Sequence, residues 1–291
     1  MPGNIGLGKQ SILQLAKHNP KTIYLGARTQ EKALAAIAEI KEAVPNASIE
    51  YIHCDLADLS SVQQCAKDFT SKNSRLDILL LNAGIMLVPA ALTKDGYETQ
   101  FGTNHVGHAL LTKLLLPTLL KTAEEPGADV RVISLSSLGH MFAPSSGISF
   151  AELKTPMAST FSVRRYGQSK LANILFASEM AKRYPSITTV AVHPGVVDTN
   201  LYQTMNGSWM GFWGLFGKVQ RYIYTSVEDG AKNQLWAATA PRGIEQGQVK
   251  SGEYYVPVGI AGQGTKSAYD QELAEKLWTW TEKEIDGYKA E

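Results

Sequence analysis

Asp77-Ile-Leu-Leu-Leu81 is apolar almost throughout and leads directly into Asn82-Ala-Gly84. A strand with no polar face is buried on both sides, as in a parallel sheet with helices on both faces. Further β-like runs are Thr22–Gly26, Ile49–His53, Val130–Leu135, Thr188–His193 and Glu253–Val256. Helical patterns occupy residues 7–18, 30–43, 59–72, 97–122, 166–184, 227–240 and 270–285. This alternation predicts an α/β fold in three layers, built on a doubly wound parallel sheet.

Bulk composition narrows the class of protein. The chain has 291 residues, of which 44% are hydrophobic, and no linker-like stretch divides it, so we expect a single domain over residues 1–291. Its formal net charge of +1 gives no electrostatic argument for binding nucleic acid. Cys54 and Cys65 have no zinc-site spacing, which favours a reduced, cytoplasmic protein. No apolar run reaches the roughly 20 residues of a membrane-spanning helix.

Tyr166-Gly-Gln-Ser-Lys170 places a phenol and an ammonium on one helix face, because residues four apart are neighbours there. A tyrosine ionises near pH ~10, and a nearby positive charge favours its phenolate. Such a pair can exchange a proton with a hydroxyl or carbonyl oxygen. Chance explains an isolated pair equally well, so its meaning depends on the rest of the chain.

The amino-terminal segment has the features of a phosphate-binding turn. Asn4-Ile-Gly6-Leu7-Gly8-Lys9 opens the first helix, where glycines allow close backbone approach and the helix N-terminus attracts anions. Arg28 follows the second strand of such a fold, where an arginine suits the 2′-phosphate of NADP and an acid suits NAD. Lys9 adds a second positive charge. An exposed loop arginine and a solvated helix lysine are the alternatives.

Two later strand ends complete the predicted cofactor site. Asp55 follows the strand that ends at His53, and its carboxylate is placed to accept a hydrogen bond from the adenine amino group. Asn82-Ala-Gly84 offers small residues for close approach of the cofactor, although an ordinary turn has the same composition. Ligands of such sheets bind outside the carboxyl ends of the strands.

Together these motifs resemble the short-chain dehydrogenase/reductase family, along the chain from residue 3 onward. The motifs occur along the chain in the same order as in the family: Asn82-Ala-Gly84, Asn104, Ser136-Ser137, Tyr166-x-x-x-Lys170 and Pro194-Gly195. Two segments are similar to the retinol-dehydrogenase-like and WW-domain-oxidoreductase-like branch: the sequence around Tyr166 and Ser251-Gly-Glu-Tyr-Tyr-Val-Pro257. Fungal members of this branch often serve secondary metabolism. The resemblance implies a Rossmann-type fold, NADP as cofactor, and homodimers that pack through the helix bearing Tyr166.

The resemblance also implies roles. Tyr166 would be the general acid or base, and Lys170 would lower its pKa and hold the nicotinamide ribose. Ser137, rather than Ser134 or Ser136, would bind the substrate oxygen. Asn104 would hold a water that relays protons to Lys170. The residues that would line the nicotinamide are Pro194, Gly195, Val197 and Thr199.

One departure from the family pattern concerns the amino terminus. The family's Thr-Gly-x-x-x-Gly-x-Gly motif would place Pro2 at its first glycine, and its first strand is missing from this chain. That strand belongs in the middle of the sheet, so its loss leaves backbone groups unpaired. A wrongly recorded start is the preferred explanation; the alternative is a true truncation that weakens NADPH binding and stability.

The substrate region is predicted between Asn200 and Val227. It contains Trp209, Phe212 and Trp213 among glycines, which indicates a lid over a lipophilic small molecule; a buried helix or shallow membrane contact are the alternatives. The sequence thus favours an NADP-dependent oxidoreductase acting on a lipophilic alcohol or carbonyl. A truncated, non-catalytic dinucleotide-fold or interaction protein is the second reading.

Overall fold

Seven strands, in two hydrogen-bonded groups, are present in a computed structural model that describes residues 3–195 and 226–289. In chain order they are β1 Ile23–Ala27, β2 Ile49–His53, β3 Ile78–Leu81, β4 Arg131–Leu135, β5 Thr188–Val192, β6 Tyr254–Val256 and β7 Ile260–Ala261. β2 pairs with β1, and a second group has the order β3-β4-β5-β6-β7. All pairings are parallel except that of β6 with β7, a short antiparallel strand that the sequence patterns did not predict.

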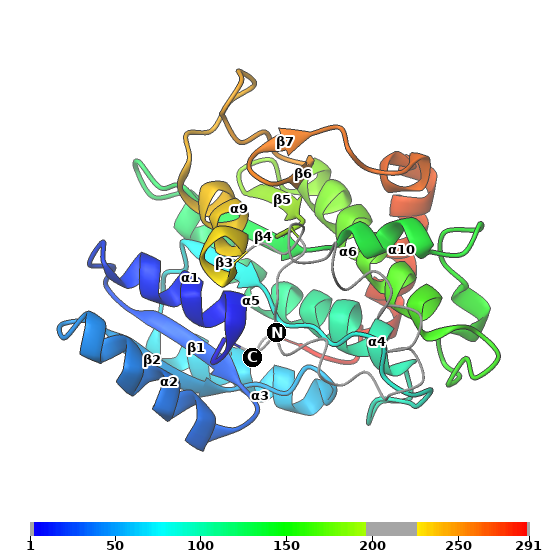
Figure 1. Cartoon of the computed structure of the whole chain (residues 1–291), viewed down its shortest axis with the longest axis horizontal. Helices are drawn as coiled ribbons and strands as arrows, with labels where there is room; N and C mark the ends of the chain where they lie inside the picture. Colours follow the sequence, from blue (N-terminus) through cyan, green and yellow to red (C-terminus); the bar gives the residue numbers. More distant parts are fainter. Residues whose placement is uncertain (1–2, 196–225, 290–291) are drawn as a thin grey trace, which may run out of the picture.

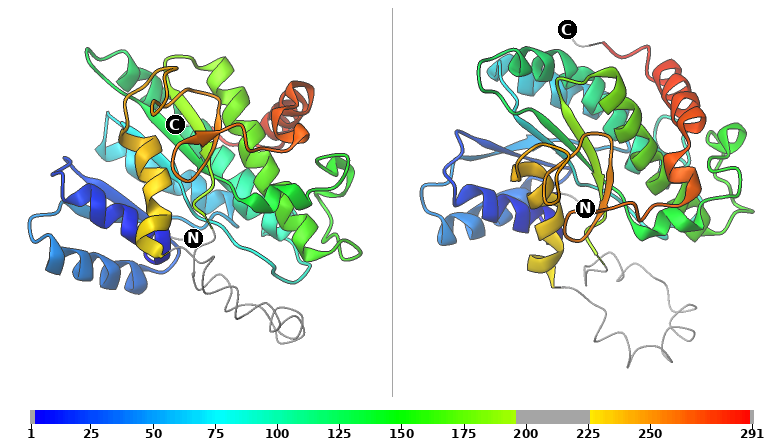
Figure 2. Two further views of the ribbon diagram at one scale, coloured as in Figure 1. Left: turned by 45° about the horizontal axis from the view of Figure 1, so that its top comes forward. Right: turned by 90° about the horizontal axis from the view of Figure 1, so that it is seen from above.

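Helices cover both faces of this sheet, as the composition of the strands predicted (Figure 1). One face carries α1 Gly6–Ala16, α2 Gln30–Ala43 and α9 Val227–Thr239; the other carries α3 Leu59–Lys72, α5 Gly107–Ala123 and α6 Ser162–Arg183 (Figure 2). Shorter elements are α4 Thr99–Phe101, the π-helical turn η1 Gly102–Val106, and the 3-10 turns η2 Leu138–Phe142, η3 Phe150–Glu152 and η5 Lys266–Tyr269. The doubly wound, Rossmann-type architecture is therefore confirmed.

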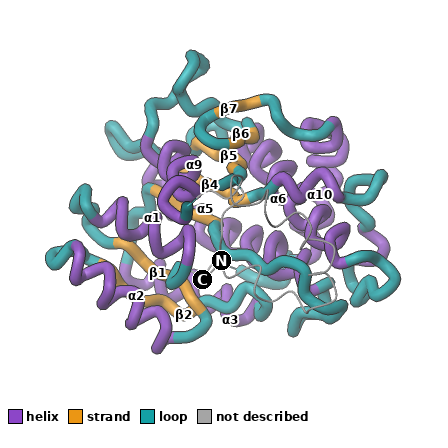
Figure 3. The backbone as a smooth tube through the Cα atoms, in the orientation of Figure 1, coloured by secondary structure: helices purple, strands orange, loops and turns teal. Residues whose placement is uncertain are grey.

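The sheet is interrupted between β1 and β3. Within residues 3–195 and 226–289, β1 pairs only with β2 and β3 pairs only with β4, and the two groups of strands appear separately in Figure 3. Burial follows this interruption: every residue of β4 and β5 is buried, whereas buried and half-buried residues alternate along β3. The backbone of Gly3 reaches the free side of β1, where its N–H donates to Gly26 O at 3.4 Å.

The helix predicted over residues 97–122 is present from Thr99 to Ala123, with one π-helical turn inside it. In this turn, η1, the backbone hydrogen bonds span one residue more than in an α-helix. The surroundings are tight at both ends of the turn: a Cβ on Gly102 would lie 2.5 Å from Thr93 Cγ2, and one on Gly107 would lie 2.4 Å from Leu56 O. No local pattern in the sequence predicts these contacts.

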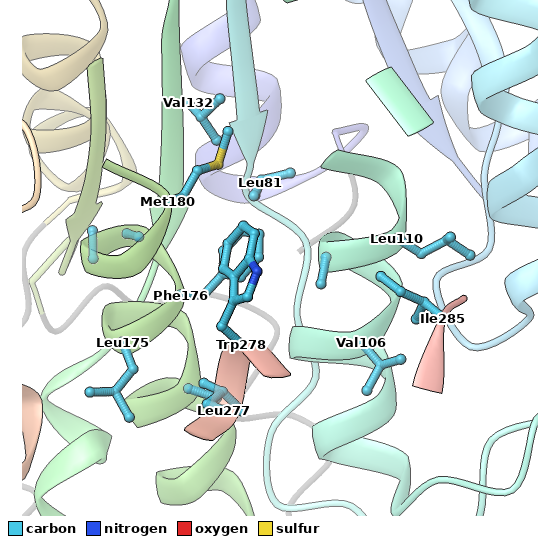
Figure 4. Packing of buried hydrophobic residues seen from close by; sticks show 14 of the residues in the cluster. Leu81, Val106, Leu110, Val132, Leu175, Phe176, Met180, Leu277, Trp278 and Ile285 are labelled. Atoms are coloured by element: carbon cyan, nitrogen blue, oxygen red, sulfur yellow. The ribbon is translucent and has the colours of Figure 1, made fainter. Parts of the chain in front are cut away.

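The carboxy-terminal helix α10, Gln271–Glu284, packs across α6 (Figure 4). Trp278 stacks on Phe176 with ring centroids 5.3 Å apart and an interplanar angle of 13°. Leu277 is fully buried beside it, and His105 Nε2 lies 2.9 Å from Thr281 Oγ1. These contacts join α10 to the core, so α10 covers part of the helix that bears Tyr166.

Candidate active site

Tyr166 and Lys170 lie one turn apart on α6, and both are buried. Lys170 Nζ donates a hydrogen bond to Leu135 O, the last residue of β4, at 3.0 Å and lies 5.8 Å from the centre of the Tyr166 ring. Burial lowers the pKa of Lys170 to about 8. The ammonium is therefore mostly protonated at neutral pH, and it stabilises negative charge that develops on the phenol.

Ser137 lies near the tyrosine ring, next to Gly139. It follows β4 and caps η2, where its Oγ accepts a hydrogen bond from Gly139 N at 3.0 Å. Since the Gly139 N–H is the donor, the serine hydroxyl keeps its own hydrogen for another acceptor. A Cβ built on Gly139 would lie 2.6 Å from Tyr166 Cε1 and 3.3 Å from Ser137 Oγ, so both side chains flank this glycine.

The two neighbouring serines are used differently. Ser136 Oγ donates to the backbone oxygen of Lys170 at 2.8 Å and is buried. Ser134 is buried within β4. The geometry thus leaves Ser137 as the serine of the three beside Tyr166.

Asn104 lies in η1 and is fully buried. Its Nδ2 donates to Ile85 O and to Ser169 Oγ, each at 2.9 Å, and its Oδ1 accepts from Ile85 N at 2.8 Å. A Cβ on Gly84 would lie 3.2 Å from both Asn104 Oδ1 and Lys170 Nζ. The side chain therefore fixes the turn after β3 beside Lys170. Its amide is satisfied by protein atoms, and its main-chain oxygen lies 3.0 Å from His108 Nδ1, so a water at this carbonyl would share the oxygen with the histidine.

The start of α1 fits an anionic group. Ile5 at its N-cap contributes no side-chain hydrogen bond, and the first turn contains no acidic residue. Within the described residues no acceptor takes the N–H groups of Gly6, Leu7 or Gly8, and Gly6 has a φ of 52°. Free N–H groups at a helix N-terminus match a pyrophosphate. Met1 and Pro2 lie outside the described residues.

Lys9, predicted to add a second positive charge to the cofactor site, forms an ion pair in the structure. Its Nζ pairs with Glu39 of α2, a carboxylate whose side chain is 61% exposed. The lysine therefore links α1 to α2 in this conformation. A phosphate at this position would compete with Glu39 for the ammonium.

Arg28 and Asp55 follow β1 and β2 at the same edge of the sheet. Arg28 is exposed and forms no ion pair with any residue of the described ranges, so its guanidinium is open to a ligand. Asp55 Oδ1 accepts from Ala57 N at 3.0 Å and so shapes the local turn. Its other carboxylate oxygen has no hydrogen-bond partner within those ranges.

Gln234 on α9 is a residue that sequence reasoning missed. Its Nε2 donates to Ser11 Oγ of α1 and, at 3.3 Å, to Asn82 Oδ1 at the end of β3. It thereby holds two predicted cofactor-binding segments together from a third element. A glutamine on a helix gives no sequence signal for such a role, because the contact joins residues 152 positions apart.

Several predicted positions cannot be placed. Val197, Thr199 and nearly all of the predicted lid over residues 200–227 lie outside the described residues. Pro194 and Gly195 are described directly after β5, and Gly195 has a φ of 91°, which favours glycine.

The histidines of η1 and α5 are packed into the core. His105 and His108 are buried, and desolvation lowers the pKa of each to about 3, so both are neutral. The described ranges contain no group of three His, Cys, Asp or Glu side chains that could hold a metal ion.

Comparisons with known proteins agree with this geometry. The family model for short chain dehydrogenases matches residues 3–146. The short-chain dehydrogenase/reductase drtF of Aspergillus calidoustus is 41% identical over 97% of this chain and 91% of its own length. The chain belongs to the short-chain dehydrogenase/reductase family.

Other members of this family are similar over most of the chain. Mouse retinol dehydrogenase 12 is 35% identical over 94% of this chain and 81% of its own length. A solved structure of an uncharacterised protein from Mycobacterium paratuberculosis is 30% identical, covers 99% of this chain and 92% of its own, and gives a TM-score of 0.73. The NADPH-bound carbonyl reductase from chicken fatty liver shares the fold at 20% identity, with a TM-score of 0.63 over 89% of this chain and 95% of its own.

Proposed function

We propose that this dehydrogenase/reductase uses NADP(H) to interconvert a carbonyl and a primary or secondary alcohol on a lipophilic small molecule. The observation that carries the proposal is the buried Lys170 beside Tyr166, together with Ser137 Oγ and the Tyr166 ring, which both flank Gly139. These are the groups that proton transfer to a carbonyl oxygen requires. Family membership supports the reaction class.

Each residue would have a distinct task. Bound NADPH supplies the hydride in carbonyl reduction. The Ser137 hydroxyl donates a hydrogen bond to the substrate oxygen and orients it. Tyr166 passes its phenolic proton to that oxygen, and the Lys170 ammonium stabilises the phenolate that remains. Alcohol oxidation is the reverse sequence, with the Tyr166 phenolate as base.

NADP is proposed because Arg28 is exposed at the end of β1, where a 2′-phosphate can reach a guanidinium. Gly6, Leu7, Gly8 and the backbone around Asn82 would hold the pyrophosphate and nicotinamide side of the cofactor. Among family members, the names of mouse retinol dehydrogenase 12 and the NADPH-bound chicken carbonyl reductase are consistent with this reading.

A lipophilic substrate is supported by exposed apolar side chains next to the catalytic groups. Met141 and Phe142 of η2 and Phe161 before α6 are 53%, 54% and 73% exposed. Met141 and Phe142 lie in the turn that Ser137 caps, and Phe161 lies directly before the helix that bears Tyr166. Substrates with hydrocarbon chains or rings would bury these side chains on binding.

We place the protein in the cytoplasm and in secondary metabolism, on the strength of its free cysteines and its similarity to fungal members of the family. Within the described residues, no helix combines the length and the apolar character that crossing a bilayer requires.

The proposal is tested by following NADPH oxidation against a panel of apolar aldehydes and ketones. Tyr166→Phe should lower kcat about 10²- to 10⁴-fold with any accepted substrate, because the proton donor is lost. Tyr184→Phe, the same change directly after α6, is the matched control and should keep wild-type activity. Equal rates for Tyr166→Phe and the wild type would refute the mechanism.

A non-catalytic dinucleotide-fold protein is the second candidate, and the observation that favours it is that, within the described residues, no strand pairs with the facing edges of β1 and β3. Weak NADPH binding by the purified 291-residue chain, measured by fluorescence titration, would support this reading. Tight binding together with an ordinary cooperative melt would reject it.

A further inference from the structure

His140 lies three residues after Ser137, in η2, and is buried. Its ring is held from two sides by backbone groups of opposite character. His140 Nδ1 lies 2.7 Å from Ser137 O, which can only accept a hydrogen bond. His140 Nε2 lies 3.2 Å from Thr265 N, which can only donate one. These two partners select one form of the ring: Nδ1 carries the hydrogen, and Nε2 is the acceptor.

The same turn packs tightly on the catalytic helix. A Cβ on Gly167 would lie 2.7 Å from Ala143 N and 2.8 Å from Gly139 O. The edge of Tyr254 in β6 meets the His140 ring at a centroid distance of 5.2 Å and an angle of 74°. η2 therefore cannot shift far relative to α6 and β6. His140 contributes the hydrogen bonds that hold this turn in place. Both ring nitrogens bind backbone, so neither is available to bind a substrate.

We propose that neutral His140 is a positioning residue, which fixes the Ser137 hydroxyl against Tyr166 by binding the Ser137 carbonyl and anchors η2 to the segment before η5 through Thr265. This role rests on the proposed function of Ser137 and Tyr166. Burial lowers the pKa of His140, in agreement with a neutral ring. Because Ser137 Oγ must meet a substrate oxygen at a defined position, a shift of its backbone reduces the rate of the chemical step.

Two substitutions separate the two hydrogen bonds. His140→Asn retains a donor near the position of Nδ1, so it keeps the bond to Ser137 O and loses the acceptor for Thr265 N. His140→Gln retains an acceptor near the position of Nε2, so it keeps the bond from Thr265 N and loses the donor to Ser137 O. We expect His140→Asn to keep kcat within about 3-fold of the wild type and His140→Gln to lower it about 10- to 100-fold, with a smaller change in KM.

Amide hydrogen exchange supplies a readout that does not depend on activity. Faster exchange is expected at Thr265 in His140→Asn, and at Gly139 and His140 in His140→Gln, where the turn after Ser137 loosens. The circular dichroism spectrum and melting curve of each variant establish that it is folded. The same exchange pattern in both variants overturns the inference, whether or not a substrate has been found.

The outcomes also separate this inference from the proposed function. An active wild type with equal kcat values for the two variants refutes the role of His140 and leaves the function intact. If the wild type is inactive but the two variants show their distinct exchange patterns, the function is refuted, while the selected ring form and its two backbone bonds stand. A kcat loss in His140→Asn larger than in His140→Gln also overturns the inference.

Discussion

Among single residues, Arg28 separates NADP from NAD in our proposal. Arg28→Asp replaces the guanidinium with a carboxylate that repels a 2′-phosphate. Hydrogen bonds to charged groups are worth about 1.5–3 kcal/mol, so we expect KM for NADPH to rise at least about 10-fold, while KM for NADH falls or stays unchanged. Lys41→Asp makes the same charge change in the last turn of α2 and is the control. An identical rise in both variants would mean that net charge alone, and not the position of Arg28, controls binding.

Lys170 gives the site a pH dependence. Its pKa is lowered by burial to about 8, so the free protein loses this charge as the pH rises through that value. We expect kcat/KM for carbonyl reduction to be constant between about pH 6.5 and 7.5 and to fall above pH 8, because the neutral amine no longer stabilises the phenolate. Lys170→Arg keeps its charge throughout this range, so whatever activity it retains should persist above pH 8. A wild-type profile that stays level to pH 9 would contradict this role for Lys170.

At the level of helices and turns, the close contact of η2 with α6 is the feature that positions Ser137. An added methyl group in Gly167→Ala would meet three backbone atoms within 2.8 Å, and backbone cannot rotate aside as a flexible side chain can. We expect a loss of about 1–3 kcal/mol in the free energy of unfolding, together with a lower kcat. Gly287→Ala is the control, because nothing lies within 4 Å of its added Cβ. Urea denaturation and NADPH turnover measure the two effects.

The helices with local signals were predicted best. The patterns over residues 30–43 and 59–72 match α2 and α3, and Asp58 caps α3 by accepting from Ser60 N and Ser61 N. The helix predicted over residues 97–122 was also found, but the patterns did not predict its π-helical turn η1, where Gly102 and Gly107 pack closely against distant segments. Local propensity contains no information about such neighbours.

The candidate site shows the same division. Tyr166, Lys170, Ser137 and Asn104 could be found from spacing and family resemblance, and the structure brings them together. The parts that were not found are long-range: the pairing of Lys9 with Glu39 and the contacts of Gln234 with α1 and β3. His140 is only three residues after Ser137 in the sequence, but only the fold reveals that Thr265 N donates to His140 Nε2.

For the whole molecule, buried neutral histidines connect stability to pH. Desolvation lowers the pKa of His193 to about 4, as it lowers those of His105 and His108 to about 3, and His140 shifts in the same direction. An unfolded chain protonates its histidines near pH 6.5. Below that pH the unfolded state binds more protons than the folded state, so the free energy of unfolding decreases as the pH falls.

Each such histidine contributes a slope of up to about 1.4 kcal/mol per pH unit between the two pKa values. We therefore expect the melting temperature to be highest near neutral pH and to fall progressively from pH 6.5 to 5. His105→Gln keeps a polar atom for Thr281 and removes one titrating group, so it should reduce the acid slope by about one proton. His18→Gln makes the same substitution at an exposed position and is its control. Equal stability of the wild type at pH 5 and pH 7 would contradict this prediction. It would mean that the histidine rings take up protons in the folded state, although burial disfavours the charged form.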